Sequence, residues 1–233
     1  MASSALYIDK NYIHCFIPTK LCRTKHIILS ATADEEIYKM HFYNRKINFI
    51  TCKEAKFRGR LIQNCSRSYS RRDLDNDSEL LKNIVSEHED FEYIITFMKY
   101  ESQFNDQKIH FGNTEGCDFM RGNNILVIGT PHLSEFVYKL FALHIGLDVD
   151  QEMRFQEVEE DSYKYWFHTY SDPNLRTIQL WFLRTELIQA VGRARLLRYD
   201  CTVKLYANLP LIRYNFFRKL KKRKKIDMLK KLW

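Results

Sequence analysis

The chain has 233 residues, of which 45% are hydrophobic and 28% charged, and its formal net charge is +8. This length and apolar content suffice for a full hydrophobic core, and the scarcity of glycine (7) and proline (4) argues against collagen-like and disordered chains. The positive charge favours an anionic partner. Six scattered cysteines without C-x-x-C spacing and the lack of a long apolar run predict a cytoplasmic protein with reduced thiols and no membrane partner.

The N-terminal third is expected to contain strands and one helix. The apolar run from His26 to Thr32 predicts a strand. A helix over residues 33–43 should follow, because Thr32 and Glu35 have the spacing of a capping box and three acids fall in its first turn. Further along, the expected elements are strands at 46–51 and 59–63, a Ser/Arg-rich loop over 64–77 and a helix over 78–89. The arginines of that loop either face phosphate or are solvated.

Strand and helix patterns alternate through the rest of the chain, which is typical of an α/β fold. Ile125–Ile128 is an apolar run between two glycines, as in a parallel strand buried on both faces. The other expected elements are strands at 91–97, 109–112 and 202–206 and helices over 136–144 and 176–192. Gln151–Tyr170 is acidic and aromatic. Its carboxylates either bind a metal or form a solvated helix face, and the lack of a histidine at helical spacing favours the helix.

Two arginines near residue 190 stand out within an apolar segment. Gln189 is followed by the sequence Gly192-Arg193-Ala194-Arg195. Burying a guanidinium group is unfavourable unless an anion meets it, and glycine lets a ligand approach the backbone closely. The pair therefore suits a polyphosphate or a nucleic-acid backbone. The alternative is a basic patch on an amphipathic helix.

This pattern resembles motif VI of superfamily 2 helicases, Q-x-x-G-R-x-x-R. Ser30-Ala31-Thr32 resembles motif III of that family, Gly116-Cys117-Asp118 resembles the end of motif V, and Ile94–Phe97 stands where motif IV is expected. The resemblance implies an α/β, RecA-like three-layer domain with a mostly parallel sheet. Its implied divisions are residues 1–43 as the end of a first RecA-like domain with a linker and residues 44–210 as the second RecA-like domain. Residues 211–233 differ sharply in composition, and their lysines, arginines and helically spaced apolar residues predict a basic amphipathic C-terminal helix. Such a helix contacts nucleic acid, contacts a membrane surface or docks its apolar face on a protein domain, and the helicase context favours phosphate contact by its basic face.

The resemblance also implies roles for single residues. Arg193 and Arg195 are the candidate catalytic arginines that stabilise charge on the γ-phosphate, with Gln189 orienting water or a phosphate oxygen. The second arginine stands one residue early compared with the family pattern, so Arg198 is a third candidate. The remaining assignments are Gly116, Asp118 and Gly192 to the nucleotide, Asn113, Thr114, Lys221, Lys222, Arg223 and Lys224 to nucleic acid, and Ser30 and Thr32 to coupling between domains.

For some of these residues, a purely structural role is an alternative interpretation. Gly116 could only permit a turn, Asp118 could cap a helix, and Ser30 and Thr32 could end a strand and begin a helix. No metal ligand is expected. Asp34-Glu35-Glu36-Ile37 has the letters of a Walker B box, but it follows the Ser-Ala-Thr segment instead of preceding it. The first turn of a helix is the simpler interpretation.

The chain lacks the sequence that would hold ATP by itself. No G-x-x-x-x-G-K-[ST] occurs, and no glycine is followed by lysine. ATP and Mg²⁺ are therefore expected only together with a P-loop-bearing RecA-like domain, in cis or in trans. The implied function is the C-terminal motor domain of a helicase or translocase on DNA or RNA, inactive as an ATPase alone. The alternatives are a stand-alone, non-catalytic nucleic-acid-binding or interaction module, and a basic scaffold whose motif matches are accidental.

The basic tail generates the first prediction. We expect the chain to bind single strands mainly through phosphate contacts, with an affinity that falls steeply as salt rises. Deleting residues 218–233 should flatten that salt dependence more than Arg193→Ala does, because Arg193 is assigned to the nucleotide and the tail to the strand. Fluorescence anisotropy of a labelled strand across a salt series measures both. An unchanged slope after the deletion would make the tail a docking or capping helix.

Overall fold

The computed structural model describes residues 5–9, 12–17, 21–22, 24–52, 55–104, 109–160 and 163–211. They form two compact units, between which the chain passes more than once. The first unit combines the described residues up to 52 with His132–Ile188, and the second combines Ala55–Pro131 with the described residues from Gln189. The expected division at residues 43 and 210 stays a prediction. The basic tail, with Lys221, Lys222, Arg223 and Lys224, lies outside the described residues.

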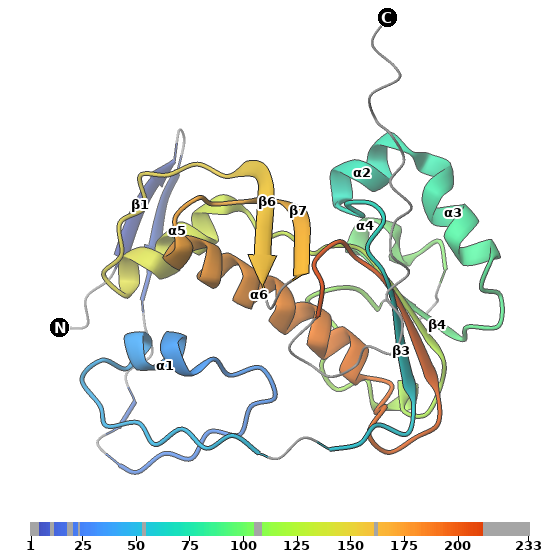
Figure 1. Ribbon diagram of the computed structural model, residues 1–233, viewed down its shortest axis with the longest axis horizontal. Helices are drawn as coiled ribbons and strands as arrows, with labels where there is room; N and C mark the ends of the chain where they lie inside the picture. The colour runs from blue at the N-terminus through green and yellow to red at the C-terminus, as the bar shows by residue number, and fades with distance from the viewer. Residues whose placement is uncertain are drawn as a thin grey trace, which may run out of the picture. The chain divides into compact units, whose positions relative to one another are not determined.

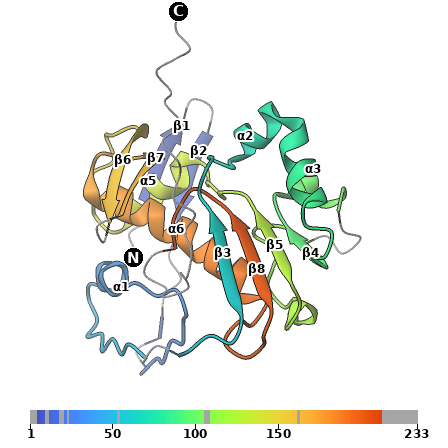
Figure 2. The same ribbon diagram turned by 45° about the vertical axis from the view of Figure 1, so that its right-hand side comes forward.

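A parallel sheet of four strands forms the centre of the second unit (Figure 2). Its order is β3-β8-β5-β4, with bounds Arg60–Asn64 (β3), Thr202–Tyr206 (β8), Ile125–Ile128 (β5) and Tyr93–Ile95 (β4). All three pairs are parallel. Parallel neighbours require crossover connections, and helices supply them here. The expected α/β class with a parallel sheet flanked by helices is confirmed.

Strand β5 shows why the sequence pattern was informative. It lies between β8 and β4, and each of its four side chains is fully buried. A strand covered on both faces cannot alternate apolar with polar residues, so it reads as a continuous apolar run. The edge strand β3 does alternate, with Leu61 and Gln63 buried and its other side chains exposed.

Three short helices cover one face of this sheet. They are α2 (Arg71–Asn76), α3 (Ser78–Ser86) and α4 (Met98–Glu101). Their apolar side chains pack with those of the sheet in one core, which comprises Tyr69, Leu74, Leu81, Ile84, Phe91, Ile94, Phe97, Tyr100, Leu126, Ile128 and Tyr206. Helix α2 was not predicted, because its six residues lie within the Ser/Arg-rich stretch that was expected to be a loop.

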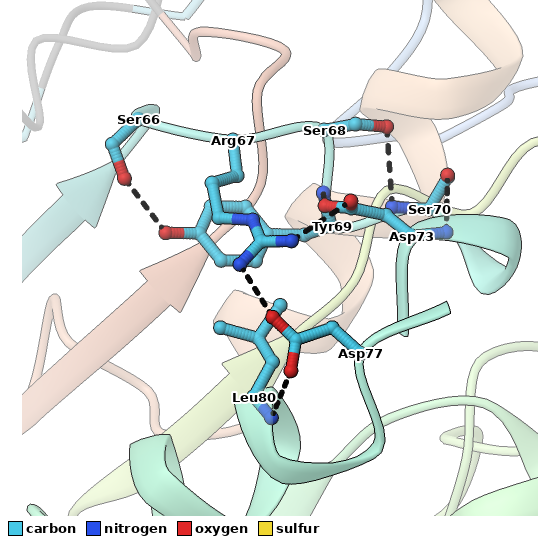
Figure 3. A network of polar contacts seen from close by, with 8 residues as sticks. All are labelled: Ser66, Arg67, Ser68, Tyr69, Ser70, Asp73, Asp77 and Leu80. Atoms are coloured by element: carbon cyan, nitrogen blue, oxygen red, sulfur yellow. Dashed lines mark hydrogen bonds and ion pairs between the residues drawn. The ribbon is translucent and has the colours of Figure 1, made fainter. Parts of the chain in front are cut away.

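A polar network fixes the connection from β3 to α3 (Figure 3). Arg67 donates to Asp73 at 3.1 Å and to Asp77 at 2.8 Å. Asp77 also caps α3 by accepting from the backbone N–H of Leu80, and Ser70 caps α2 by accepting from that of Asp73. One guanidinium group therefore ties together the first turns of two helices.

The described residues of the first unit form two antiparallel hairpins and three helices (Figure 1). The hairpins are β1 (Ala5–Asp9) with β2 (Tyr12–Phe16) and β6 (Arg154–Glu160) with β7 (Tyr163–Thr169); the helices are α1 (Glu35–His41), α5 (Glu135–His144) and α6 (Pro173–Gly192), whose last turn enters the second unit. Its apolar core comprises Ile37, Tyr138, Phe141, Ala142, Tyr170, Leu175 and Ile178.

Caps explain where two of these helices begin. Helix α1 follows Asp34, whose carboxylate accepts from the N–H groups of Glu36 and Ile37, so the expected capping box of Thr32 and Glu35 is wrong. A carboxylate directly before the first turn satisfies two free donors and also meets the positive end of the helix dipole. Asp172 caps α6 in the same way through Leu175, and proline follows at the first helical position.

Several predicted elements are absent or different. Residues 26–32 and 46–51 are not strands, and Ile27, Ile28 and Leu29 are exposed, because no neighbouring strand in the described residues pairs with them. The segment 109–112 forms only one bridge, between His110 and Thr96. The helix expected within Gln151–Tyr170 is instead the β6–β7 hairpin. Its aromatic and β-branched residues alternate inward, with Val158, Tyr165 and Phe167 buried.

The described part of the chain contains neither a membrane-spanning helix nor a group of side chains suited to bind a metal ion. Its helices include none that is both long and apolar enough to cross a membrane. Nor does that part bring three or more histidine, cysteine or acidic side chains together in a group that could hold a metal ion. Each of the six cysteines is described, and none forms a disulfide.

The network around Arg67 generates the second prediction. Asp77→Ala removes both the cap of α3 and a partner of Arg67, and should lower the free energy of unfolding by about 1–2 kcal/mol. Asp77→Asn keeps a capping oxygen and loses only a partly exposed ion pair, so its effect should be at most about half as large. Urea unfolding monitored by circular dichroism measures both, with the exposed Asp90→Ala as control. Equal effects of the two substitutions would show that the ion pair, and not the cap, dominates.

Candidate anion-binding site

Two loops meet at the end of the sheet where its strands begin. The turn containing Gly116 and Asp118 leads towards β5, and the turn containing Arg193 and Arg195 leads towards β8. Because β5 and β8 are neighbours in the sheet, the two turns lie side by side. A backbone hydrogen bond of 3.0 Å from Gly122 to the carbonyl of Ala194 joins them.

Buried side chains anchor the arginine turn. Helix α6 ends at Gly192, and Ala194 and Leu196 are then buried while the arginines on either side of Ala194 are not. The thiol of the buried Cys201 also donates to the carbonyl of Ala194. With Ala194 and Leu196 anchored, Arg195 is exposed and Arg193 is half-buried.

Arg195 has an unusual backbone conformation. Its φ is 57°, in the left-handed region, where a side chain with a Cβ atom is disfavoured by about 1–2 kcal/mol. Its carbonyl accepts hydrogen bonds from the N–H groups of Arg198 and Tyr199, which hold the turn in this shape. Glycine is the usual residue at such a position, so the guanidinium group is retained against a conformational penalty.

The guanidinium group of Arg195 bonds to Asp118. Its Nη2 atom donates to Oδ1 of Asp118 at 2.9 Å. The hydrogen bond and charge of Arg195 lower the pKa of the Asp118 carboxyl group, and the charges of Arg121 and Arg193 lower it further. Both side chains are largely exposed, so the pair adds little to stability. Asp118 is thus an ionised carboxylate next to three arginines.

Arg193 is the member of this cluster with an unsatisfied donor. Its Nε atom is buried and has no hydrogen-bond partner among the described residues. Leaving a charged donor buried and unpaired costs more than about 1–3 kcal/mol, and an anion that accepts from it removes that cost. Because Asp118 neutralises the charge of Arg195, the charge of Arg193 remains as a net positive charge beside this donor.

The structure brings some predicted residues together and separates others. Gly116, Asp118, Gly192, Arg193 and Arg195 lie in the two adjoining turns. Gly116 has φ 74° and open space around its α-carbon, which fits both a turn and a close approach by a ligand. Arg121 was not selected from the sequence, although it follows Asp118 by three residues and its charge also lowers the pKa of the Asp118 carboxyl group.

Other assignments fit less well. Thr114 is 2% exposed, which leaves its backbone N–H as the group that could meet a phosphate, and its assignment to nucleic acid stays a prediction. Asn113 is exposed and keeps its predicted role. Gln189 is half-buried, and Arg198 is exposed with its backbone N–H bonded to Arg195. The roles of both also stay predictions.

Ser30 and Thr32 belong to the first unit. The hydroxyl of Ser30 accepts from the N–H of Thr32 at 3.2 Å, and the carbonyl of Thr32 accepts from the indole of Trp181 at 2.9 Å. The segment is therefore attached to α6, although it is not a strand. Its expected coupling role stays a prediction.

Two arginines of the Ser/Arg-rich stretch have partners within the fold. Arg67, one of the arginines that could face phosphate, is bonded to two carboxylates (Figure 3). Arg71 lies over the ring of Phe97 at 5.2 Å. The sequence left two interpretations of this loop: its arginines face phosphate, or they are solvated. Neither interpretation describes Arg67, because two carboxylates of the fold neutralise its charge.

Comparison with known proteins adds no assignment: no protein-family model, curated protein or solved structure matches this chain.

The backbone of Arg195 generates the third prediction. Arg195→Gly and Arg195→Ala both lose the ion pair with Asp118, but glycine adopts a positive φ without the Cβ penalty. The glycine variant should therefore unfold with a free energy about 0.5–1 kcal/mol higher than that of the alanine variant. The same pair at Arg198, whose φ is not positive, should show the opposite order. Chemical denaturation compares the four variants. An alanine variant at 195 as stable as the glycine variant contradicts the conformation.

Proposed function

We propose that the second unit is a RecA-like domain with three layers and that it acts as the C-terminal motor domain of an ATP-dependent helicase or translocase. In this proposal the cluster of Arg193, Arg195 and Asp118 faces the terminal phosphates of ATP held by a P-loop domain. The observation that carries the proposal is the contact between Asp118 and Arg195. It joins two sequence patterns that are 77 residues apart and that the same family would place together.

The chemistry of the cluster supports a role towards phosphate. In phosphoryl transfer, negative charge spreads over the oxygens of the transferred group, and fixed guanidinium groups stabilise it without reorganisation. Arg195 is held by Asp118, whereas Arg193 has a buried donor with no partner among the described residues. We therefore assign the direct phosphate contact to Arg193. Arg195 and Asp118 are assigned to holding the turn and its charge in place.

The parallel sheet supports the proposal independently of the motifs. Its four strands and covering helices are compatible with a RecA-like layer arrangement. The partner domain, ATP and Mg²⁺, the DNA or RNA strand and the cytoplasmic location remain parts of the proposal. The competing function is a non-catalytic nucleic-acid-binding module, in which the arginine cluster would bind a strand and not a nucleotide.

The test uses phosphate in its simplest form. Inorganic tripolyphosphate should bind the chain, and Arg193→Ala should weaken binding by about tenfold or more, because one charged hydrogen bond contributes about 1.5–3 kcal/mol. Arg72→Ala removes the same charge from an exposed site in α2 and should have no comparable effect. Isothermal titration calorimetry measures the three proteins.

A second titration separates the two functions. A labelled single strand should bind Arg193→Ala as well as it binds the unmodified chain if Arg193 serves the nucleotide. Loss of strand binding with unchanged tripolyphosphate binding would support the non-catalytic module and overturn the motor proposal. ATP turnover by the chain alone, abolished by Arg193→Ala, would contradict the need for a separate P-loop domain.

A further inference from the structure

The β6–β7 hairpin has an outward face that its own fold does not use. Its inward side chains, including Val158, Tyr165 and Phe167, are buried. The alternate positions point the other way, and they carry Phe155, Glu157 and Glu159 on β6 and Lys164, Trp166 and His168 on β7. This face is therefore mixed, with two large aromatic rings among charged groups.

The two aromatic side chains on this face are exposed and stacked on each other. Phe155 is 62% exposed and Trp166 is 55% exposed, and their rings stack with centroids 5.6 Å apart and planes at 25°. They are diagonal neighbours across the two strands, because Phe155 pairs with His168 and Trp166 pairs with Glu157. Exposed rings held on paired strands form a flat platform whose position is fixed before a partner arrives.

The charges beside this platform are mixed, with two carboxylates, Glu157 and Glu159, acting on one ammonium group, that of Lys164. Glu159 pairs with Lys164 at 3.2 Å, and on the inward face Glu160 pairs with Arg184. Glu157 lies directly opposite Trp166, is exposed, and forms no ion pair among the described residues. Aromatic faces attract cations, and a neighbouring carboxylate strengthens that attraction, whereas it repels a nucleic-acid backbone.

The edge of β6 offers a place for the main chain of a partner. Among the described residues β6 pairs only with β7, so the backbone groups on its other edge are not used by a strand. On β7, by contrast, the carbonyl of His168 already accepts from Gln179 of α6. A segment added along β6 would place every second side chain on the outward face, next to Phe155, Glu157 and Glu159.

We infer that this face is a docking surface for an extended basic segment of a partner protein. The segment adds to the edge of β6, and an arginine or lysine side chain packs on the Phe155–Trp166 platform beside Glu157. This inference does not depend on the proposed motor function, since it rests on the first unit alone.

The test uses a short labelled peptide of alternating arginine and threonine, with fluorescence anisotropy on the full chain. The peptide should bind, and Trp166→Ala should weaken binding by about tenfold, as expected for loss of a cation–π contact. Glu157→Gln should weaken it several-fold. Tyr43→Ala and Glu36→Gln remove an exposed ring and an exposed carboxylate from elsewhere in the first unit and should change nothing.

Two further probes define the mode of binding. N-methylation of alternate residues on the pairing edge of the peptide removes backbone donors and should abolish strand addition. A peptide with glutamate in place of arginine should not bind. Peptide affinity that is insensitive to Trp166→Ala and Glu157→Gln overturns the inference. So does a single-stranded oligonucleotide whose binding is lost in Trp166→Ala, because the platform would then stack bases. All substituted side chains are exposed, and circular dichroism confirms that the variants remain folded.

Discussion

The pairing of β5 with β8 is the constraint on which the candidate site depends. These strands are far apart in the sequence, yet they are parallel neighbours with Ile125 opposite Val203. In a parallel sheet every strand begins at the same end, so the segments that precede neighbouring strands must converge there. The turns of Asp118 and Arg195 precede these two strands. Their contact is thus a consequence of the sheet order, and neither turn could reach the other if β5 and β8 were separated.

The arginine cluster is less stable than it could be, and this is informative. Arg195 has a strained φ, Arg193 has a buried unpaired donor, and the pair of Arg195 with Asp118 is too exposed to compensate. A site selected only for stability would have glycine at 195 and a solvated or paired side chain at 193. Strain and unmet hydrogen bonding in one small region are typical of sites that are completed by a ligand. A ligand that completed this site would be anionic, because the unmet donor belongs to a positively charged guanidinium group.

The elements that the sequence predicted well are those with long or unambiguous patterns. The apolar run of β5, the strand at 202–206 and the helix ending near Gly192 follow from burial and periodicity alone. The pattern failed where two signals competed. Gln151–Tyr170 is rich in glutamate, which favours a helix, but its aromatic residues alternate with polar ones. This period of two is typical of a strand, and the segment forms the β6–β7 hairpin. Thr32 and Glu35 have the spacing of a capping box, yet the carboxylate of Asp34 stands closer to the free N–H groups.

The candidate site was predictable only in part. The residues Gly116, Asp118, Gly192, Arg193 and Arg195 could be selected from composition and resemblance, but their contact could not be derived without the sheet order. The strained backbone of Arg195 carries no recognisable sequence signal. The burial of Thr114 is likewise not predictable, because a threonine in a short turn has the same local sequence pattern whether its hydroxyl is exposed or covered. Tertiary packing decides such cases, and local spacing does not.

The polar groups at the carboxyl ends of the strands bear on why the candidate anion site lies at the opposite end, where the strands begin. Open α/β sheets usually bind ligands at the end where their strands finish. Here the fold itself occupies the polar groups at that end. Thr130 donates to the carbonyl of Ser68 and Gln63 donates to those of Ala207 and Leu209, while Arg67 is neutralised by its two carboxylates. These side-chain donors at that end are therefore already bonded within the fold and are not free to bind a phosphate. Under the proposed function, such a domain would supply arginines to a nucleotide that another domain holds.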